Sequence, residues 1–361
     1  MKIKYIGLFF MALMLMGFSA RLSAKKDSIE YKRVRVTGMP TVGYNNSFGL
    51  QLGALGMMMF DIKRADTISP TSSLIGMGFY TTNNTWFGLL GQRLYWAEDN
   101  WRAAWAFGYG NINFQFYAEG LPGTGNGFID YTTSTRFVYA ELTPRVYKRL
   151  YIGLGYMRNR MSTTFYLDDI IGVNPDSLKT VSGFGIPLSW DSRDNTFNPS
   201  SGLHINMKTL FYKKWVGSDL NYSSLNFDAN YYWPINNHAV LASRITVYTG
   251  LGEVPFEGLR TVGRDDIRGY SKGEYRGDQI YTIQTEYRHT FSNHFGFVAF
   301  LGFAAANNSL SEDTESWSGL LPGLGAGIRY MAIKDKKINL GIDAAVGKGD
   351  WGLYFRIGEA F

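Results

Sequence analysis

The most constraining feature of this sequence is the alternation of polar and apolar residues in many short segments. Between Ser224 and Trp233, Ser, Asn and Asp side chains share one face, while Leu, Phe, Ala, Tyr and Trp share the other. The same period of two runs through Leu203–Phe211 and Asn111–Phe116. That period is typical of β-strands with one apolar face. Beyond the N-terminus no apolar run reaches the length of a membrane helix, so we predict an all-β fold.

Composition indicates which kind of all-β protein this is. Aromatic residues make up 16% of the chain, and charged residues, at 18%, fall below the usual quarter. A transmembrane β-barrel has this balance because only alternate residues need be apolar. Aromatic clusters at Tyr95–Trp101 and Tyr231–Trp233 suit the girdles of such a barrel. The alternative is a large soluble all-β protein, whose apolar faces would point inward; we favour the transmembrane antiparallel β-barrel.

Alternation and turn residues predict about 16 strands. An even number brings both ends of the barrel to one side of the membrane, as in single-chain bacterial barrels. The expected ranges are 33–44, 48–61, 72–81, 85–97, 101–117, 131–147, 150–166, 180–191, 202–214, 220–233, 238–249, 278–290, 295–306, 321–332, 337–346 and 351–361.

The N-terminus reads as an export signal. Lys2 and Lys4 precede the apolar run Tyr5–Ala20, and cleavage is expected after Ala20 or Ala24. We therefore predict three segments, which are a signal peptide (1–24), a short periplasmic lead (25–32) and a barrel domain (33–361). A lead of this length leaves no room for a soluble periplasmic domain before the barrel.

Several function classes find little support. Removing residues 1–24 removes three basic residues and no acid, so the charge becomes 33 − 30 = +3, too small to indicate a nucleic-acid partner. Cysteine is absent, and the four histidines lack metal spacing, so no metal or cofactor is expected. The Gly347-x-Gly349-x-x-Gly352 pattern lies in a hairpin rather than before a helix, which indicates a turn. We expect no enzyme; a Ser-His-acid phospholipase remains the enzymatic alternative.

Connection lengths alternate along the chain. With a periplasmic N-terminus, the long connections fall on the outer side, as they do in outer-membrane barrels. These expected outer loops are 118–130, 167–179, 250–277 and 307–320. The intervening turns are short, with two exceptions at 62–71 and 192–201.

Three motifs stand out in this framework. Ile267-Arg268-Gly269-Tyr270 lies in the longest connection, whose length itself indicates a functional role. The turn at 192–201 is framed by a second motif, with Asp191, Arg193, Asp194, Pro199 and Gly202. The third is the C-terminal strand, with Tyr354, Phe355 and the terminal Phe361. In this order the three motifs resemble the barrel domain of the BamA/TamA-type outer-membrane assembly family (bacterial surface antigen family) over roughly residues 40–361.

The resemblance implies roles for these motifs. The loop carrying Arg268 is expected to fold into the lumen, where its guanidinium needs an acidic partner. One acid that the family uses is missing here, because its position is occupied by Phe300. Glu286 and Asp343 are the nearest lumen-facing substitutes. The turn motif has either a family-specific structural role or simple local capping.

The C-terminal motif is expected to serve as a barrel-insertion signal on a lipid-facing strand, with Phe361 on the same face as Trp351 and Leu353. The implied function is that of a barrel-only outer-membrane member that assists insertion or transport of protein or lipid. The implied mechanism is a weak seam between the first and last strands. Expected partners are outer-membrane lipid, client proteins and periplasmic or surface lipoproteins. The alternatives are a passive pore and a structural barrel that scaffolds a surface complex.

Overall fold

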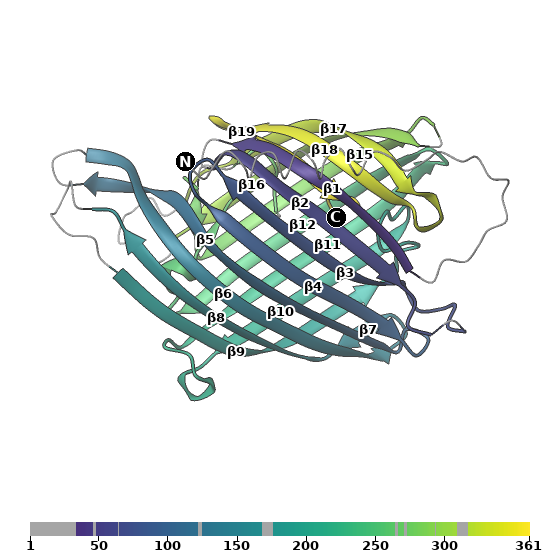
Figure 1. The fold of residues 1–361 in the computed structure, drawn as a ribbon, viewed down its shortest axis with the longest axis horizontal. Helices are drawn as coiled ribbons and strands as arrows, with labels where there is room; N and C mark the ends of the chain where they lie inside the picture. The colour runs from purple at the N-terminus through teal and green to yellow at the C-terminus, as the bar shows by residue number, and fades with distance from the viewer. Residues whose placement is uncertain are drawn as a thin grey trace, which may run out of the picture. The chain divides into compact units, whose positions relative to one another are not determined.

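The fold is a single antiparallel sheet that closes on itself (Figure 1). The computed structural model describes residues 34–45, 48–63, 65–121, 125–167, 176–263, 266–270, 273–292, 294–308 and 317–361. The strands of the first half are β1 (Val34–Asn45), β2 (Gly49–Phe60), β3 (Ser72–Thr81), β4 (Trp86–Trp96), β5 (Trp101–Leu121), β6 (Gly125–Tyr147), β7 (Leu150–Ile152), β8 (Leu154–Phe165) and β9 (Asp176–Asp191). Those of the second half are β10 (Gly202–Tyr212), β11 (Tyr222–Asn236), β12 (Ala239–Gly252), β15 (Gln279–Thr290), β16 (Phe295–Asn307), β17 (Leu321–Ile333), β18 (Ile338–Gly347) and β19 (Asp350–Ile357).

The described sheet has 17 strands, of which two form one crossing. β7 and β8 both pair with β6 and β9, and only Gly153 separates them. A Cβ at Gly153 would lie 1.9 Å from the carbonyl oxygen of Leu142, so the interruption is a place where two backbones approach closely. Counting β7 and β8 as one crossing gives sixteen, and the predicted transmembrane barrel of about 16 strands is confirmed. No helix in the described part of the chain is long and apolar enough to cross a membrane.

The seam that closes the barrel is much shorter than any neighbouring strand pair. β1 and β2 are in register from Val34↔Phe60 to Asn45↔Gly49. β18 and β19 pair from Leu340↔Ile357 to Gly347↔Asp350. Between the described parts of β1 and β19, the register contains the single pair Asn45↔Gly352.

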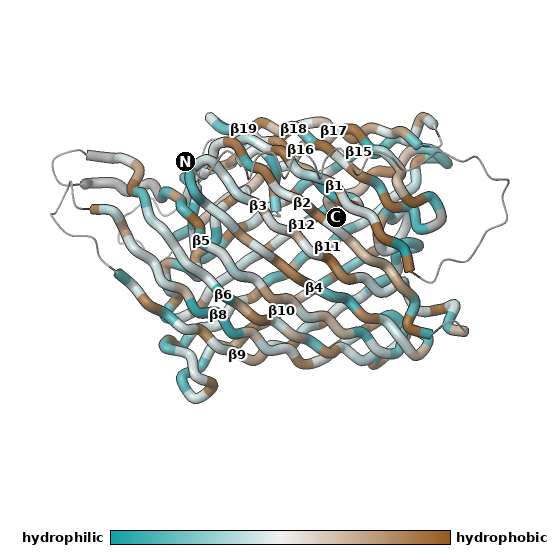
Figure 2. Tube along the Cα trace, viewed as in Figure 1, coloured by the Kyte–Doolittle hydropathy of each residue, from teal (hydrophilic) through white to brown (hydrophobic). Residues whose placement is uncertain are grey.

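Side chains alternate across the barrel wall. Along β16, exposed and buried residues follow each other almost without exception, and Val298 and Phe300 lie on the buried, lumenal side. Phe297, Leu301 and Phe303 are exposed on the outer side. Figure 2 shows apolar and polar colours alternating along the strands. The outward apolar residues form the surface that a bilayer covers.

The third outer connection differs from the prediction. Residues 118–130 were expected to form a loop, but β5 and β6 continue as a paired hairpin through Ala118↔Gly127 to Leu121↔Gly125. The backbone there pairs on both sides of a register shift between Ala118 and Leu121, so the hairpin extends beyond the predicted strand ends. The fourth connection is also shorter than expected, since β9 begins at Asp176.

The C-terminus also departs from the prediction. The last strand was expected to run to Phe361, but β19 ends at Ile357. Gly358 has a φ of +88°, a left-handed conformation that favours glycine. Its N–H donates to Asn339 O at 2.7 Å, and the chain then leaves the wall. The predicted signal peptide and periplasmic lead lie outside the described residues, which form one compact unit from Val34 to Phe361.

Candidate functional site: the lumen loop and its arginine cluster

The connection between β12 and β15, residues 253–278, enters the barrel; we call it the lumen loop. It contains the short 3-10 helix η2 (Phe256–Gly258) and two small strands, β13 (Arg260–Thr261) and β14 (Arg276–Gly277), which pair with each other. Ile267 and Tyr270 pack with wall residues Tyr248, Ile280 and Leu321 in one buried cluster. The predicted inward-folded sixth loop is therefore confirmed.

Arg268 lies at the loop tip, and three polar wall residues surround its guanidinium. Nη1 donates to Asp343 Oδ2 at 2.6 Å, and Nη2 donates to Glu286 Oε2 at 2.6 Å. Nε donates to Gln284 Oε1 at 3.2 Å. Arg268 is 4% exposed, and both carboxylates are fully buried. The structure thus brings Arg268 against both Glu286 and Asp343 at once. Such charge-assisted bonds hold the tip firmly because breaking them would leave a buried charge.

Phe300 occupies the position of the missing acid. It is the direct cross-strand neighbour of Glu286, on β16. Arg268 Cζ lies 3.3 Å from the centroid of the Phe300 ring. A buried guanidinium over an aromatic face gains cation–π attraction. In this chain an aromatic ring contacts the arginine at the position where the resemblance implied that an acid is missing.

The residues that flank Arg268 fix the path of the tip. Gly269 has a φ of +110°, and a Cβ there would lie 2.7 Å from the backbone of Val346. Its N–H donates to the Tyr354 hydroxyl of β19 at 2.8 Å. Tyr270 donates its hydroxyl to Pro322 O at 2.6 Å. The tip therefore contacts both β17 and β19, the last strand before the seam.

Several members of this site are absent from the sequence-based prediction. Arg329 donates to Asp343 Oδ1 at 2.5 Å and to Glu359 Oε2 at 2.8 Å. Arg288 donates to Glu286 Oε1 at 2.8 Å, and Arg356 Nε lies 3.0 Å from Asp343 Oδ2. We call the seven charged residues the arginine cluster: Arg268, Arg288, Arg329, Arg356, Glu286, Asp343 and Glu359.

The alternation of side chains along each strand could have predicted part of the arginine cluster. Arg288 is two residues from Glu286 and therefore shares its face. Asp343 also requires Gly327 opposite it, because a Cβ there would lie 1.9 Å from Asp343 Oδ1. That requirement depends on the strand register, which the sequence alone does not supply.

The turn motif forms a second polar group, at the end of the barrel where the short turns lie. Arg193 makes a bidentate pair with Asp191, with both N···O distances 2.9 Å. Arg102 Nη1 reaches the same carboxylate at 3.1 Å. Gly202 has a φ of +107°, and a Cβ there would meet Ser192 O at 2.4 Å. Asp191 is thus held by two arginines from different parts of the wall.

Within the turn, Asp194 caps the returning chain. Its Oδ1 accepts hydrogen bonds from Ser200 N at 2.9 Å and Ser201 N at 3.1 Å. Burial acts to raise the pKa of Asp194, but these bonds and the Ser200 hydroxyl hold that pKa below its usual value. Pro199, which directly precedes Ser200, is buried. Local capping, one of the two expected roles, is therefore present.

The turn also crosses the barrel. Phe197 packs with Met57 of β2 and Ile338 of β18, although the turn joins β9 and β10. Its carbonyl oxygen accepts from Glu359 N at 3.4 Å. Figure 1 draws β9 and β19 at opposite edges of the barrel. Residues 192–201 therefore extend across the mouth at the end where the short turns lie.

The C-terminal residues do not all lie where they were expected. Tyr354 faces the lumen and binds the loop tip, as described above. Phe361 is not on the outer face, because its backbone oxygen accepts from Arg288 Nη2 at 2.8 Å. The Arg244 and Arg288 guanidinium groups lie 5.7 and 5.4 Å from its ring. The predicted outward position of Phe361 was wrong because alternation assigns a residue to a face only as long as the strand continues.

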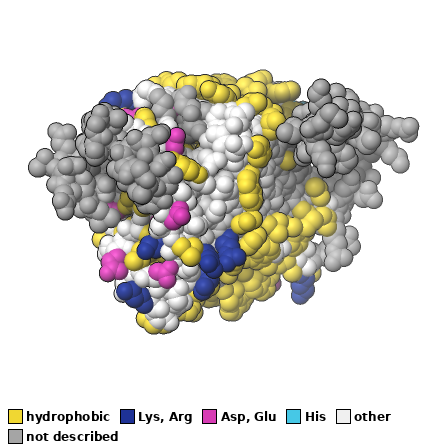
Figure 3. All heavy atoms as spheres, turned by 60° about the vertical axis from the view of Figure 1, so that its left-hand side comes forward, with side chains coloured by type: hydrophobic (Ala, Val, Ile, Leu, Met, Phe, Trp, Pro, Cys, Tyr) yellow, Lys and Arg dark blue, Asp and Glu magenta, His cyan; other side chains and the backbone are white. Residues whose placement is uncertain are grey.

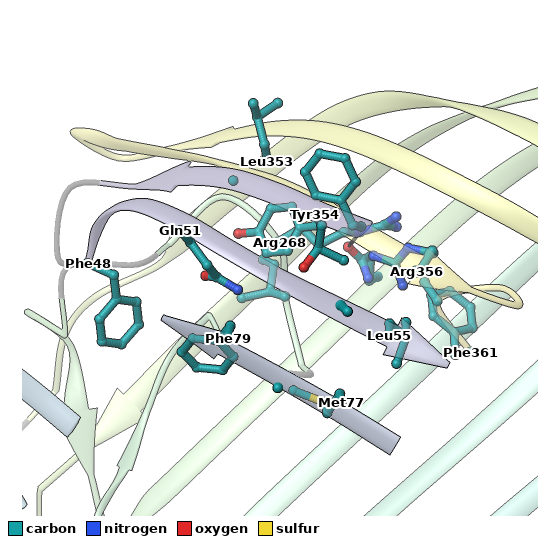
Figure 4. Close-up of a pocket in the computed structure, with 18 residues that line it drawn as sticks. Phe48, Gln51, Leu55, Met77, Phe79, Arg268, Leu353, Tyr354, Arg356 and Phe361 are labelled. Atoms are coloured by element: carbon teal, nitrogen blue, oxygen red, sulfur yellow. Dashed lines mark hydrogen bonds between the residues drawn. The ribbon is translucent and has the colours of Figure 1, made fainter. Parts of the chain in front are cut away.

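A cavity of about 360 Å³ lies beside the loop tip. Figure 4 shows Arg268, Tyr354 and Arg356 bordering it, with Gln51 and Met77 on the nearby strands. Residues of β1 and β19 both line it, so the cavity adjoins the seam. Among the residues that the structure describes, no group of three or more His, Asp or Glu side chains is arranged to hold a metal ion.

These features define the class of protein: a transmembrane β-barrel of sixteen crossings whose lumen contains an inward-folded loop held by a buried arginine. The chain belongs to the Omp85 superfamily, whose domain profile matches residues 76–361. The predicted resemblance to BamA/TamA-type barrels is thereby confirmed at the level of the superfamily. No curated protein matches the chain.

Solved structures agree with the fold. BamA from Haemophilus ducreyi lacking POTRA domains 1–3 is similar with a TM-score of 0.59 and 14% identity, over 98% of this chain and 78% of that one. CdiB from Escherichia coli is similar with a TM-score of 0.62 and 13% identity, over 91% and 63%. CdiB from Acinetobacter baumannii is similar with a TM-score of 0.56 and 12% identity, over 90% of this chain and 60% of that one. The chain thus spans less than two thirds of either CdiB chain.

Proposed function

We propose that this protein is an outer-membrane barrel that assists the insertion or transport of protein or lipid through its seam. The observation that carries the proposal is that, among the described residues, the single pair Asn45↔Gly352 joins β1 to β19. In a closed barrel in lipid, the backbone groups along each strand edge are normally hydrogen-bonded to the neighbouring strand. An unpaired backbone group in hydrocarbon costs on the order of several kcal/mol. A one-pair seam can open at a lower cost than any other strand pair of this wall.

An open strand edge is a template for another strand. Backbone N–H and C=O groups along β1 can accept an incoming extended segment by β-augmentation. The lumen loop supports this role, since Gly269 and Tyr270 tie β17 and β19 to the loop rather than to β1. The last strands would then stay rigid while β1 moves.

Outer-membrane location is part of the proposal, supported by the superfamily and by the BamA and CdiB barrels to which the fold is similar. Separate periplasmic or surface lipoproteins are proposed to deliver clients. We propose no catalytic step and no cofactor.

A passive pore is the first alternative. It is disfavoured by the two segments that cross the lumen, the loop tip at Arg268 and the turn at Phe197. Steady single-channel conductance that Arg268→Ala leaves unchanged would favour the pore. A structural scaffold is the second alternative. It would be favoured if lipoproteins co-purify with the barrel in stoichiometric amounts while the barrel is inactive in the client-folding assay described below.

The experiment uses the purified protein in liposomes and a urea-unfolded eight-stranded outer-membrane barrel as client. Folding of the client is followed by its heat-modifiable shift on cold gels. We expect client folding to be faster than in liposomes containing an unrelated sixteen-stranded porin at the same density. Equal rates in the two preparations would contradict the proposal.

A further inference from the structure

A second site lies on the opposite surface of the wall, where β6 and β8 face lipid. The outward residues of β6 are apolar from Val146 through Leu142 to Val138, and the next outward residue is Arg136. The eight residue steps from 146 to 138, at about 3.3 Å each and tilted by about 40°, cover about 20 Å, close to the ~25 Å apolar band of such barrels. Arg136 thus marks the end of the band on the side of the outer loops.

Arg136 is directly opposite another arginine. The register of β6 and β8 pairs Arg136 with Arg160 and Val138 with Arg158. Directly opposed residues have Cβ atoms about 5 Å apart, and like charges placed so are destabilising. All three arginines are exposed on the outward face. We call Arg136, Arg158 and Arg160 the outer arginine group.

The described residues do not neutralise this group. No ion pair joins any of its three members to an acid in the part of the chain that the structure describes, and Arg158 Nη1 makes one long contact of 3.4 Å with Ser182 Oγ. Asp219 lies beside Thr180, the neighbour of Arg160 on β9; its carboxylate accepts from Thr180 N at 2.6 Å, and it forms no ion pair with Arg160. Among the described residues, three exposed guanidinium groups therefore gather without an ion-pair partner.

Aromatic side chains frame the group. Tyr109 of β5, directly opposite Arg136, is 49% exposed and packs edge-on against Trp86. On the other side Phe184 packs at a tilt against Trp215, which is 77% exposed. Exposed aromatic rings of this kind mark the level of lipid head groups. In Figure 3, which brings this side forward, dark blue side chains border the yellow apolar surface.

We propose that the outer arginine group binds the phosphates of a phosphorylated membrane lipid. Guanidinium forks match phosphate oxygens in geometry and charge, and an anion between Arg136 and Arg160 would convert their repulsion into attraction. The acyl chains of the same molecule would lie on the apolar wall that begins at Val138 and Tyr156. A soluble anion would use only the charges, whereas the position at the rim of the apolar band fits a lipid.

The test uses the full-length barrel in phosphatidylcholine nanodiscs. The probes are bis-phosphorylated lipid A and its monophosphoryl derivative, and bound lipid is counted by native mass spectrometry. The test variant is Arg136→Gln/Arg158→Gln/Arg160→Gln. The matched control removes three exposed basic charges at the opposite end of the barrel: Lys148→Gln/Arg149→Gln/Lys337→Gln.

We expect the wild type and the control to retain the bis-phosphorylated lipid over the monophosphoryl one, and the test variant to lose about tenfold or more in affinity for it. The test variant should still fold, with an unchanged or raised heat-modification temperature in phosphocholine detergent, because a like-charge pair has been removed. Equal retention by wild type and test variant, or an equal loss in the control, would overturn the proposal. Displacement of the lipid by inorganic pyrophosphate at equal phosphate concentration would show a soluble-anion site instead, and would overturn the assignment to a lipid.

Discussion

The guanidinium of Arg268 lies over the ring of Phe300, with Cζ 3.3 Å from the ring centroid, while Glu286 and Asp343 hold its two terminal nitrogens. The loop tip is therefore held by two acids and an aromatic face. Because Phe300 and Glu286 are cross-strand neighbours, one rung of the wall supplies both the ring and a carboxylate.

The first prediction separates these contributions. Phe300→Leu should lower the stability of the barrel by about 1–2 kcal/mol, since a desolvated cation–π contact is lost. Arg268→Ala should lower the stability further, because two buried acids lose a partner. The expected loss is about 3–5 kcal/mol, reduced to the extent that water in the lumen solvates the two acids. Urea unfolding in detergent measures both. Phe303→Leu, on the outer face of the same strand, is the control, and an effect as large as that of Phe300→Leu would argue against the contact.

The second prediction concerns Gly269. Gly269→Ala should release the tip, because the new Cβ would meet the Val346 backbone at 2.7 Å in a backbone conformation that alanine disfavours. A cysteine at position 267 should then react faster with a bulky thiol reagent. Gly319→Ala is matched, since Gly319 has a φ of +70° with nothing within 4 Å of its Cβ position. If both substitutions change reactivity equally, backbone strain and not the contact with β18 is responsible.

Much of the wall could be predicted because a period of two is a local property. Alternation in segments such as Ser224–Trp233 located the strands, and the connection lengths located the lumen loop. Parity also placed Glu286 and Asp343 on the inner face. These inferences need no knowledge of which strands are neighbours.

The remaining features depend on contacts that are distant in sequence. That Asp343 binds Arg329 and Arg356 as well as Arg268 follows from register and from the space at Gly327. The inward course of Phe361 depends on one residue, Gly358, where the strand ends. Likewise, the reach of Phe197 across the mouth follows only from closure of the barrel.

The third prediction concerns that mouth. Phe197→Asp should detach the turn from Met57 and Ile338, because an aspartate in this apolar cluster has no partner. Planar-bilayer recordings should then show larger or more frequent conducting events than the wild type. Phe291→Asp places the same charge in an exposed turn at the same end and should leave conductance unchanged. Wild-type conductance in the Phe197 variant would mean that the turn does not obstruct the lumen.

The fourth prediction follows from the lowered pKa of Asp194. A carboxyl group whose folded-state pKa is depressed stabilises the protein above its unfolded pKa, about 3.9, and the stabilisation is lost as the pH falls through the folded pKa. Asp194→Asn should therefore lower the melting temperature by about 1–2 °C at pH 7. The difference should shrink as the pH falls below about 4 and disappear in stronger acid. A difference between Asp194→Asn and wild type that is constant from pH 7 to pH 3 would contradict the assignment.

The measurement that tests the seam most directly is a disulfide lock in a chain that has no cysteine of its own. Gly352 pairs with Asn45 across the seam and with Ala345 within the wall, so Asn45→Cys/Gly352→Cys and Ala345→Cys/Gly352→Cys share one position. Oxidising the first variant should reduce client folding in liposomes to the rate without the barrel, and reduction should restore it, while the second variant stays active in both states. Full activity of the oxidised seam variant, with the disulfide verified by mass spectrometry, would show that the seam does not open during function.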